Sequence, residues 1–146
     1  MSIVTQVAKA VTAELNRDQE FFIPFEATFS VKPNYEHVNL DTIRVVVVPK
    51  SLEIERVSRV SSKYIVTIDI GIIQRLGKLT PEEAVDSLGD LVDEIAEFLS
   101  DRELDDFKAA TFVSIENDPV YVPEYLSQHR TFMSVLSVKY ILAVSR

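Results

Sequence analysis

The two histidines and three glycines of this chain are the first residues to test for chemistry. His37 and His129 each lack a second ligand at metal-binding spacing, so we expect both to lie in loops. The glycines, Gly71, Gly77 and Gly89, are too widely spaced for a loop that cradles phosphate. Without cysteine, the chain has no thiolate nucleophile and no disulfide. The sequence therefore predicts no catalytic motif, no metal site and no cofactor.

Acidic residues form the strongest charge pattern. Residues 82–106 carry eleven acidic residues and one basic residue, whereas the rest of the chain carries twelve acidic and fourteen basic residues. A field of this sign repels nucleic acid. Within it, residues 101–106 (DRELDD) alternate acids as a calcium loop does, but lack its central glycine and closing glutamate. We interpret them as a solvated, acidic helix end.

The acidic region coincides with the clearest predicted helix, residues 80–100. Its start, TPEE, supplies an N-cap threonine, a proline at the first helical position and the glutamate of a capping box. Gly89, which costs about 1 kcal/mol in mid-helix, suggests close packing. The exposed face would be covered by Asp86, Asp90, Asp93, Glu94 and Glu97. Two interpretations stay open: a solvated face, or one that meets a basic partner or lines a passage for DNA.

Apolar periodicity predicts a second helix and the strands of one sheet. The helix covers residues 2–15. The strands cover 25–31, 42–48, 52–59, 63–73, 110–116 and 132–142. Pro49 is expected to end regular pairing of the valine-rich strand. The order predicts one α+β domain, with a mostly antiparallel sheet of about five to six strands and two main helices on one face.

Charged and apolar residues alternate along residues 52–59, LEIERVSR, which we expect to pair with 63–73 in a long hairpin. One interpretation is an edge strand whose charges prevent unwanted pairing. The other is a contact with a neighbouring subunit, because mixed signs suit a self-complementary ring. The residues of that contact would be Glu53, Glu55, Arg56 and Arg59.

The predicted loop at residues 117–130 is longer than most connections, and long loops are often functional. Tyr121, Tyr125 and Arg130 are of types enriched at protein interfaces; alternatively, both tyrosines cover the sheet edge. A competing hypothesis is a small enzyme or ligand-binding domain. Its polar groups would be Asp118, Tyr121, Glu124 and His129.

The N-terminus lacks a basic head followed by a continuous apolar run, so we expect no signal peptide. No apolar run reaches the roughly 18–20 residues of a membrane helix. We therefore expect a soluble protein that is made in the cytoplasm.

Six segments, which together span nearly the whole chain, carry a resemblance to a known family. They are IVTQVAKAVTAEL, RVVVVPKSLEIERVSR, KYIVTIDIGI, TPEEAVDSLGDLVDEIAEFL, DPVYVPEYL and TFMSVLSVKYIL. In this order they resemble the tail terminator, or tail completion, proteins of long-tailed bacteriophages. The likeness is an order of elements with a few characteristic residues and not a catalytic signature. Related neck and head–tail joining proteins share much of it.

The resemblance implies a structural virion protein without enzyme activity or cofactor. Such proteins form a ring, typically a hexamer, on the last ring of the tail tube. The ring stops tube polymerisation and provides the surface that the head connector binds. The implied partners are further copies of the chain, the tail tube protein and the head connector or neck protein. DNA passes through without specific binding, and no membrane is involved.

The implied location is the tail or neck of the virion, after assembly in the host cytoplasm. Only the hairpin charges carry over from the family as subunit contacts. They are Glu53, Glu55, Arg56 and Arg59.

Overall fold

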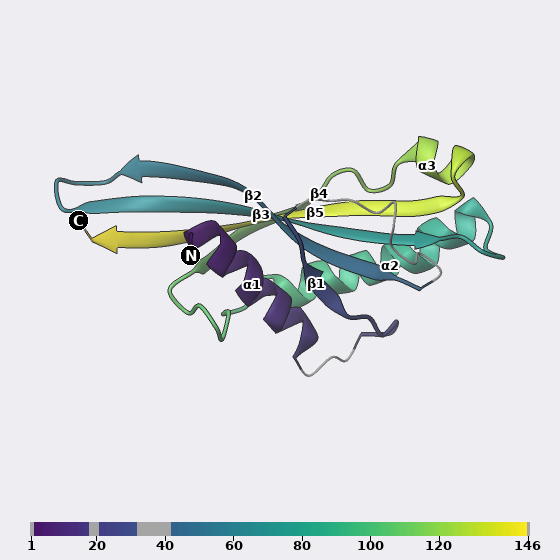
Figure 1. Cartoon of the computed structure of the whole chain (residues 1–146), viewed down its shortest axis with the longest axis horizontal. Coiled ribbons are helices and arrows are strands. Elements are labelled where there is room, and N and C mark those ends of the chain that lie inside the picture. Colours follow the sequence, from purple (N-terminus) through teal and green to yellow (C-terminus); the bar gives the residue numbers. More distant parts are fainter. Residues whose placement is uncertain (1, 18–20, 32–41, 146) are drawn as a thin grey trace.

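A single five-stranded sheet, with strand order β1-β2-β3-β5-β4, organises the chain (Figure 1). The computed structural model describes residues 2–17, 21–31 and 42–145. Its elements are α1 (Ile3–Asn16), β1 (Ala27–Phe29), β2 (Arg44–Arg56), β3 (Ser61–Arg75), α2 (Pro81–Leu99), β4 (Thr111–Asn117), α3 (Pro123–Gln128) and β5 (Thr131–Ser145). Only β1 runs parallel to its neighbour, β2; the other pairs are antiparallel. The predicted α+β fold with a mostly antiparallel sheet is confirmed.

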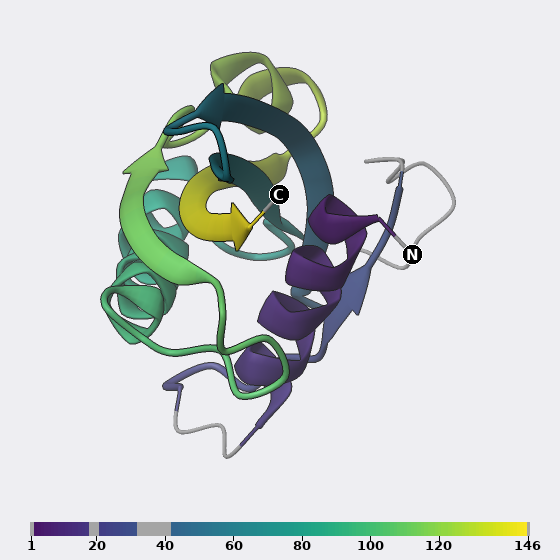
Figure 2. The same ribbon diagram turned by 90° about the vertical axis from the view of Figure 1, so that its left-hand side faces the viewer.

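Both long helices pack on the same face of the sheet, as predicted. Buried residues of α1 and α2 form one cluster with alternate residues of β2, β3 and β5. On β3, Ile68, Ile70 and Ile72 are fully buried. The antiparallel register places Ile70 opposite Val47 on one side and Leu136 on the other. The two-residue period of each strand therefore defines the core face. Figure 2 shows this twisted sheet end-on, with β2 and β4 curving around β5.

Local signals determine where α2 begins. The Thr80 hydroxyl accepts a hydrogen bond from the Glu83 amide at 3.2 Å, and the Glu83 carboxylate accepts one from the Thr80 amide at 3.3 Å. The predicted capping box is therefore present. The expectation of close packing at Gly89 is wrong, because a Cβ at this position would meet no atom within 4 Å beyond its chain neighbours and the backbone of its own helix.

β2 is one continuous strand, although the sequence predicts that regular pairing ends at Pro49. Its pairing with β3 shifts register between Pro49 and Ser51, which makes Lys50 the extra residue of a β-bulge. The Val47 carbonyl points to β1, where it accepts a hydrogen bond from the Ser30 amide at 3.0 Å. Pro49, two residues on, faces the same outer side, so its missing N–H removes no bond to β3. Three strands therefore precede α2, and not four.

A short helix, α3, lies within residues 117–130, which the sequence predicts to be a loop. Pro123 occupies its first turn, and no side chain caps it at Val122. Leu126 anchors the helix, since it is 8% exposed and joins the core cluster. A helix of six residues is too short to show a clear apolar period in the sequence.

A buried carboxylate joins the end of α1 to the segment after α2. Glu14 is 1% exposed. Its oxygens accept hydrogen bonds from Arg102 Nε at 2.6 Å, Arg17 Nη1 at 2.9 Å and the Asp105 amide at 3.2 Å. Burial alone would raise the pKa of Glu14. The hydrogen bonds and positive charges outweigh burial and hold that pKa below its ordinary value.

Residues 101–106 are therefore not simply a solvated helix end. α2 ends before them, at Leu99. Asp105 and Asp106 each pair with Arg17, at 3.1 and 3.0 Å. The acidic segment thus holds the C-terminal end of α1 in place.

Candidate assembly surfaces

At one end of the molecule the sheet continues beyond both helices. β3 and β5 have 15 residues each, about 50 Å at the usual rise of a strand. α1 has 14 residues and α2 has 19, or about 21 and 28 Å. Figure 1 shows β2, β3 and β5 projecting to the left past the helices. We call this projection, residues 51–65 and 141–145, the arm.

The bulge at Lys50 decides which side chains each face of the arm presents. Before the bulge, Val47 points to the helix side. After it, Leu52 lies opposite the core residue Val66, and Ile54 follows on the same face. A strand without the extra residue would place the glutamates there instead, because side chains alternate strictly.

On the helix-side face of the arm the apolar residues of β2 are exposed, whereas Leu142 of β5 is buried and Tyr64 of β3 is half-buried. Leu52 is 41% exposed and Ile54 is 56% exposed, while Val57 and Val60 at the turn reach 65% and 67%. The predicted alternation assigns Leu52 and Ile54 to the correct side of the strand, but neither helix covers them. Clustered apolar side chains in such exposed positions mark an interaction site.

The four hairpin charges predicted as subunit contacts all lie on the arm. Glu53 and Glu55 point away from the helix side, and Glu55 lies 3.6 Å from Lys63 on the paired strand. Arg56 and Arg59 lie at or beside the turn. Arg56 Nε donates to a turn carbonyl at 3.3 Å, while no acid in the described part of the chain pairs with Arg59.

One edge of the arm has no strand beside it in the described structure. β1 pairs with β2 only over Val45–Val47, so the later residues of β2 pair with β3 alone. The predicted edge position of this segment is therefore confirmed. Its charges suit an edge that must avoid unselective pairing, and the subunit contact stays a prediction.

The three loop residues predicted at an interface lie at the opposite end of the molecule (Figure 1). Tyr125, on α3, is 37% exposed, and its ring meets His129 edge-on with centroids 5.5 Å apart. Tyr121 is 39% exposed and lines a hollow beside the first turns of α2. Arg130 donates to two carbonyl oxygens of the turn that leads into α2, at 3.3 and 3.2 Å. The fold does not bring this group and the arm together.

The acidic face predicted on α2 is present. Four of its five members are exposed and pair with no base in the described residues: Asp86, Asp90, Asp93 and Glu97. Their spacing of four, three and four residues places them on one side of the helix. Glu94 is half-buried, and its carboxylate accepts a hydrogen bond from the Phe22 amide at 3.2 Å. The face is a stripe of negative charge that remains available to a partner.

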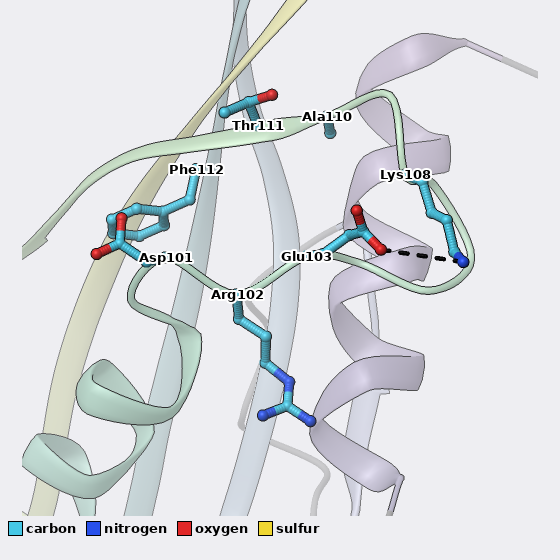
Figure 3. A pocket seen from close by; sticks show the side chains of 7 residues that line it. All are labelled: Asp101, Arg102, Glu103, Lys108, Ala110, Thr111 and Phe112. Carbon is cyan, nitrogen blue, oxygen red and sulfur yellow. Dashed lines mark ion pairs between the residues drawn. The ribbon is translucent and has the colours of Figure 1, made fainter.

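Another hollow, of about 170 Å³, lies between the end of α2 and the start of β4 (Figure 3). Lys108 and Glu103 point toward each other there, with 3.9 Å between the charged atoms. Arg102 points away from them, and its guanidinium binds Glu14. Because Lys108, Glu103 and Arg102 already have ionic partners, we interpret the hollow as a structural contact between α2 and β4 and not as a binding site.

The polar groups of the competing enzyme hypothesis are dispersed. Of the four, only Tyr121 lines the hollow beside α2, and the near neighbour of His129 is the Tyr125 ring. Across residues 2–17, 21–31 and 42–145, no three His, Asp or Glu side chains could hold a metal ion together. His37 lies outside these ranges. None of the described helices combines the length and hydropathy of a membrane span.

Comparison with known proteins does not assign the chain to a family. The chain matches no protein-family model, and no curated protein matches it. The likeness to tail terminators therefore rests on the order of segments in the sequence, and a function has to be argued from the surfaces.

Proposed function

We propose that this chain is a structural virion protein, a tail terminator that forms a ring on the end of the tail tube of a long-tailed bacteriophage. In this role it stops tube polymerisation and offers the docking surface for the head connector. The observation that carries the proposal is the arm. It is apolar and exposed at Leu52 and Ile54 on one face and charged at Glu53 and Glu55 on the other. Such a surface suits a chain that assembles with copies of itself.

The acidic face of α2 supports the same proposal. Four carboxylates on one side of the helix, none of them paired with a base among the described residues, create a local negative field. Directed toward a ring's lumen, that field would repel DNA phosphates, so that DNA passes without being held. Directed outward, it would offer a docking surface to a basic partner.

Particles assembled without this protein test the proposal. We expect overlong tails or heads that are not joined to tails, and we expect the wild-type protein supplied in trans to restore normal particles. Supplying Arg56→Glu/Arg59→Glu protein should fail to restore them, although we expect this variant to fold, because both residues are exposed. Normal tail length together with normal joining in the absence of the protein would refute the proposal.

Tail length separates the terminator from its close alternative. A neck or head–tail joining protein acts after the tube has stopped growing. Its absence would therefore leave tails of normal length beside unjoined heads. Negative-stain images of the purified protein add a direct test, because a ring-forming protein should show closed rings, typically of six copies.

A further inference from the structure

The turn of the arm presents two exposed valines on an ordered loop. Val57 and Val60 are 65% and 67% exposed. The amides of Val57 and Ser58 both donate to the Ser61 carbonyl, at 3.1 and 3.2 Å, and the hydroxyls of Ser58 and Ser61 lie 2.9 Å apart. A turn that is already ordered loses little conformational entropy when it docks.

The same turn is positively charged. Residues 56–63, which we call the tip, contain Arg56, Arg59 and Lys63 and no acid. Lys63 lies near Glu55, but Arg59 has no ion-pair partner in the described structure. The tip therefore combines an apolar surface with free positive charge.

A hollow at the other end of the molecule has the complementary character. We call it the end pocket; its volume is about 410 Å³, and it is lined by Pro81, Glu82, Val85, Asp86, Tyr121 and Leu126. Its apolar floor includes Leu126, which is buried, and Val85, which is half-buried. Glu82 and Asp86 form an exposed acidic rim, and neither has an ion pair among the described residues. A pocket of this volume has room for two small apolar side chains.

The tip and the end pocket of one chain cannot meet. β3 begins at Ser61, within the tip, and ends at Arg75, just before the turn into α2. Its 15 residues span about 50 Å. Figure 1 shows the turn of the arm at the left and the start of α2, with α3, at the right. A contact between these two surfaces must therefore join two copies, each using its tip on one neighbour and its pocket on the other.

We infer that the tip of one copy docks in the end pocket of the next copy. The valines of the tip cover the apolar floor, and its arginines face the acidic rim. The inference rests on the proposed function, to which it adds the surface that receives the arm. A head-to-tail contact of this kind closes into a ring when its rotation closes, and otherwise builds a filament.

Cysteine cross-linking tests the contact directly, because the chain has no cysteine of its own. The variant Val60→Cys/Val85→Cys places one thiol on the tip and one in the pocket. Their separation within a chain prevents an internal disulfide. Mild oxidation should therefore give a ladder of linked chains on a non-reducing gel. The matched control, Val60→Cys/Thr111→Cys, uses an exposed residue of the other hollow, and should give at least tenfold less linked product.

Charge exchange tests the electrostatic part of the contact. Arg59→Glu should raise the dissociation constant of self-association about tenfold, measured by sedimentation. Adding Glu82→Arg to the same chain should restore association, because the two signs are exchanged at every contact. Adding Glu103→Arg, an exposed acid outside the end pocket, should not restore it. Circular dichroism checks that each variant is folded.

The outcomes separate this inference from the proposed function. Rings that form without the Val60–Val85 cross-link, and without rescue by Glu82→Arg, overturn the end pocket as the receiving surface and leave the proposed function standing. A chain that stays monomeric at all concentrations also overturns the inference. Tail length in particles lacking the protein decides the proposed function independently.

Discussion

The covered and projecting halves of the sheet follow the same alternation, but the apolar residues of β2 in the projecting half are not buried. In the covered half, Ile68 and Ile70 are fully buried. In the arm, Leu52 and Ile54 occupy the same face and are 41% and 56% exposed. The strand patterns do not cause this difference. α1 and α2 are shorter than the strands, so they do not reach the part of β2 that carries Leu52 and Ile54.

The comparison shows what an apolar alternation can and cannot reveal. It identifies the face of a strand that avoids water, but not the element that covers it. In the covered half that element belongs to the same chain. In the arm, we propose that the element that covers Leu52 and Ile54 belongs to the next copy. Exposed apolar side chains are unfavourable unless they are buried on assembly.

The largest expected effect compares one isoleucine from each half. Ile70→Ala should lower the free energy of unfolding by about 3 kcal/mol, because it leaves a cavity in a fully packed core. Ile54→Ala, the matched change in the arm, should lower it by less than about 0.5 kcal/mol. Urea denaturation of both variants measures the difference. Equal losses would mean that the arm is packed in the isolated chain, and the comparison would fail.

The next largest effect concerns the buried carboxylate of Glu14, which joins α1 to the segment after α2. Glu14→Gln should lower the free energy of unfolding at neutral pH by about 2–3 kcal/mol, since it removes a buried charge that accepts three hydrogen bonds. Glu103→Gln, which alters an exposed pair at 3.9 Å, is the control and should change little. Urea denaturation at pH 7 measures the free energy of unfolding of both variants.

The loss should depend on pH in a defined direction. Folding lowers the pKa of Glu14, so its contribution is present above the ordinary glutamate pKa and disappears as pH falls through the lowered value. The stability of wild type and Glu14→Gln should therefore converge in acid, below about pH 4. A difference that stays constant down to pH 2 would show that the ionised carboxylate is not its source.

The features that could be predicted from the sequence are those with local causes. The capping box of α2 depends on neighbouring residues, Thr80 and Glu83. The strand faces depend on alternation within each strand. The effect of Pro49 cannot be predicted in this way, because it depends on which neighbouring strand its backbone faces, and residue spacing does not reveal this. The role of Glu14 has no local signal in the sequence, because its partner Arg102 lies 88 residues away.

The candidate surfaces also divide into features that could be predicted from local sequence and features that could not. The charges of the arm and the acidic face of α2 could be predicted, since both follow from period and residue type. The exposure of Leu52 and Ile54 could not, because it depends on how far the helices reach across the sheet. The end pocket joins α2 to residues around α3, and nothing local in the sequence predicts that meeting.

A charge reversal on the arm should separate assembly from folding. Arg56→Glu/Arg59→Glu changes exposed residues that form no ion pair among the described residues. The free energy of unfolding should change by less than about 0.5 kcal/mol, while self-association weakens by tenfold or more. Light scattering and urea denaturation on one sample measure both. Loss of folding together with assembly would show that the arm stabilises the isolated chain.

The smallest effect uses a glycine of the covered half. Gly89→Ala should raise the free energy of unfolding by about 0.5–1 kcal/mol, because alanine favours the helix and its Cβ meets no atom within 4 Å beyond its chain neighbours and the backbone of its own helix. Gly77→Ala, at a position with φ of +59°, should instead lower it. Gly89 lies next to Asp90 at the border of the acidic face. An alanine that stabilises the fold but weakens assembly would therefore indicate a close protein contact on that face, whereas unchanged assembly is expected if the face borders solvent or a lumen.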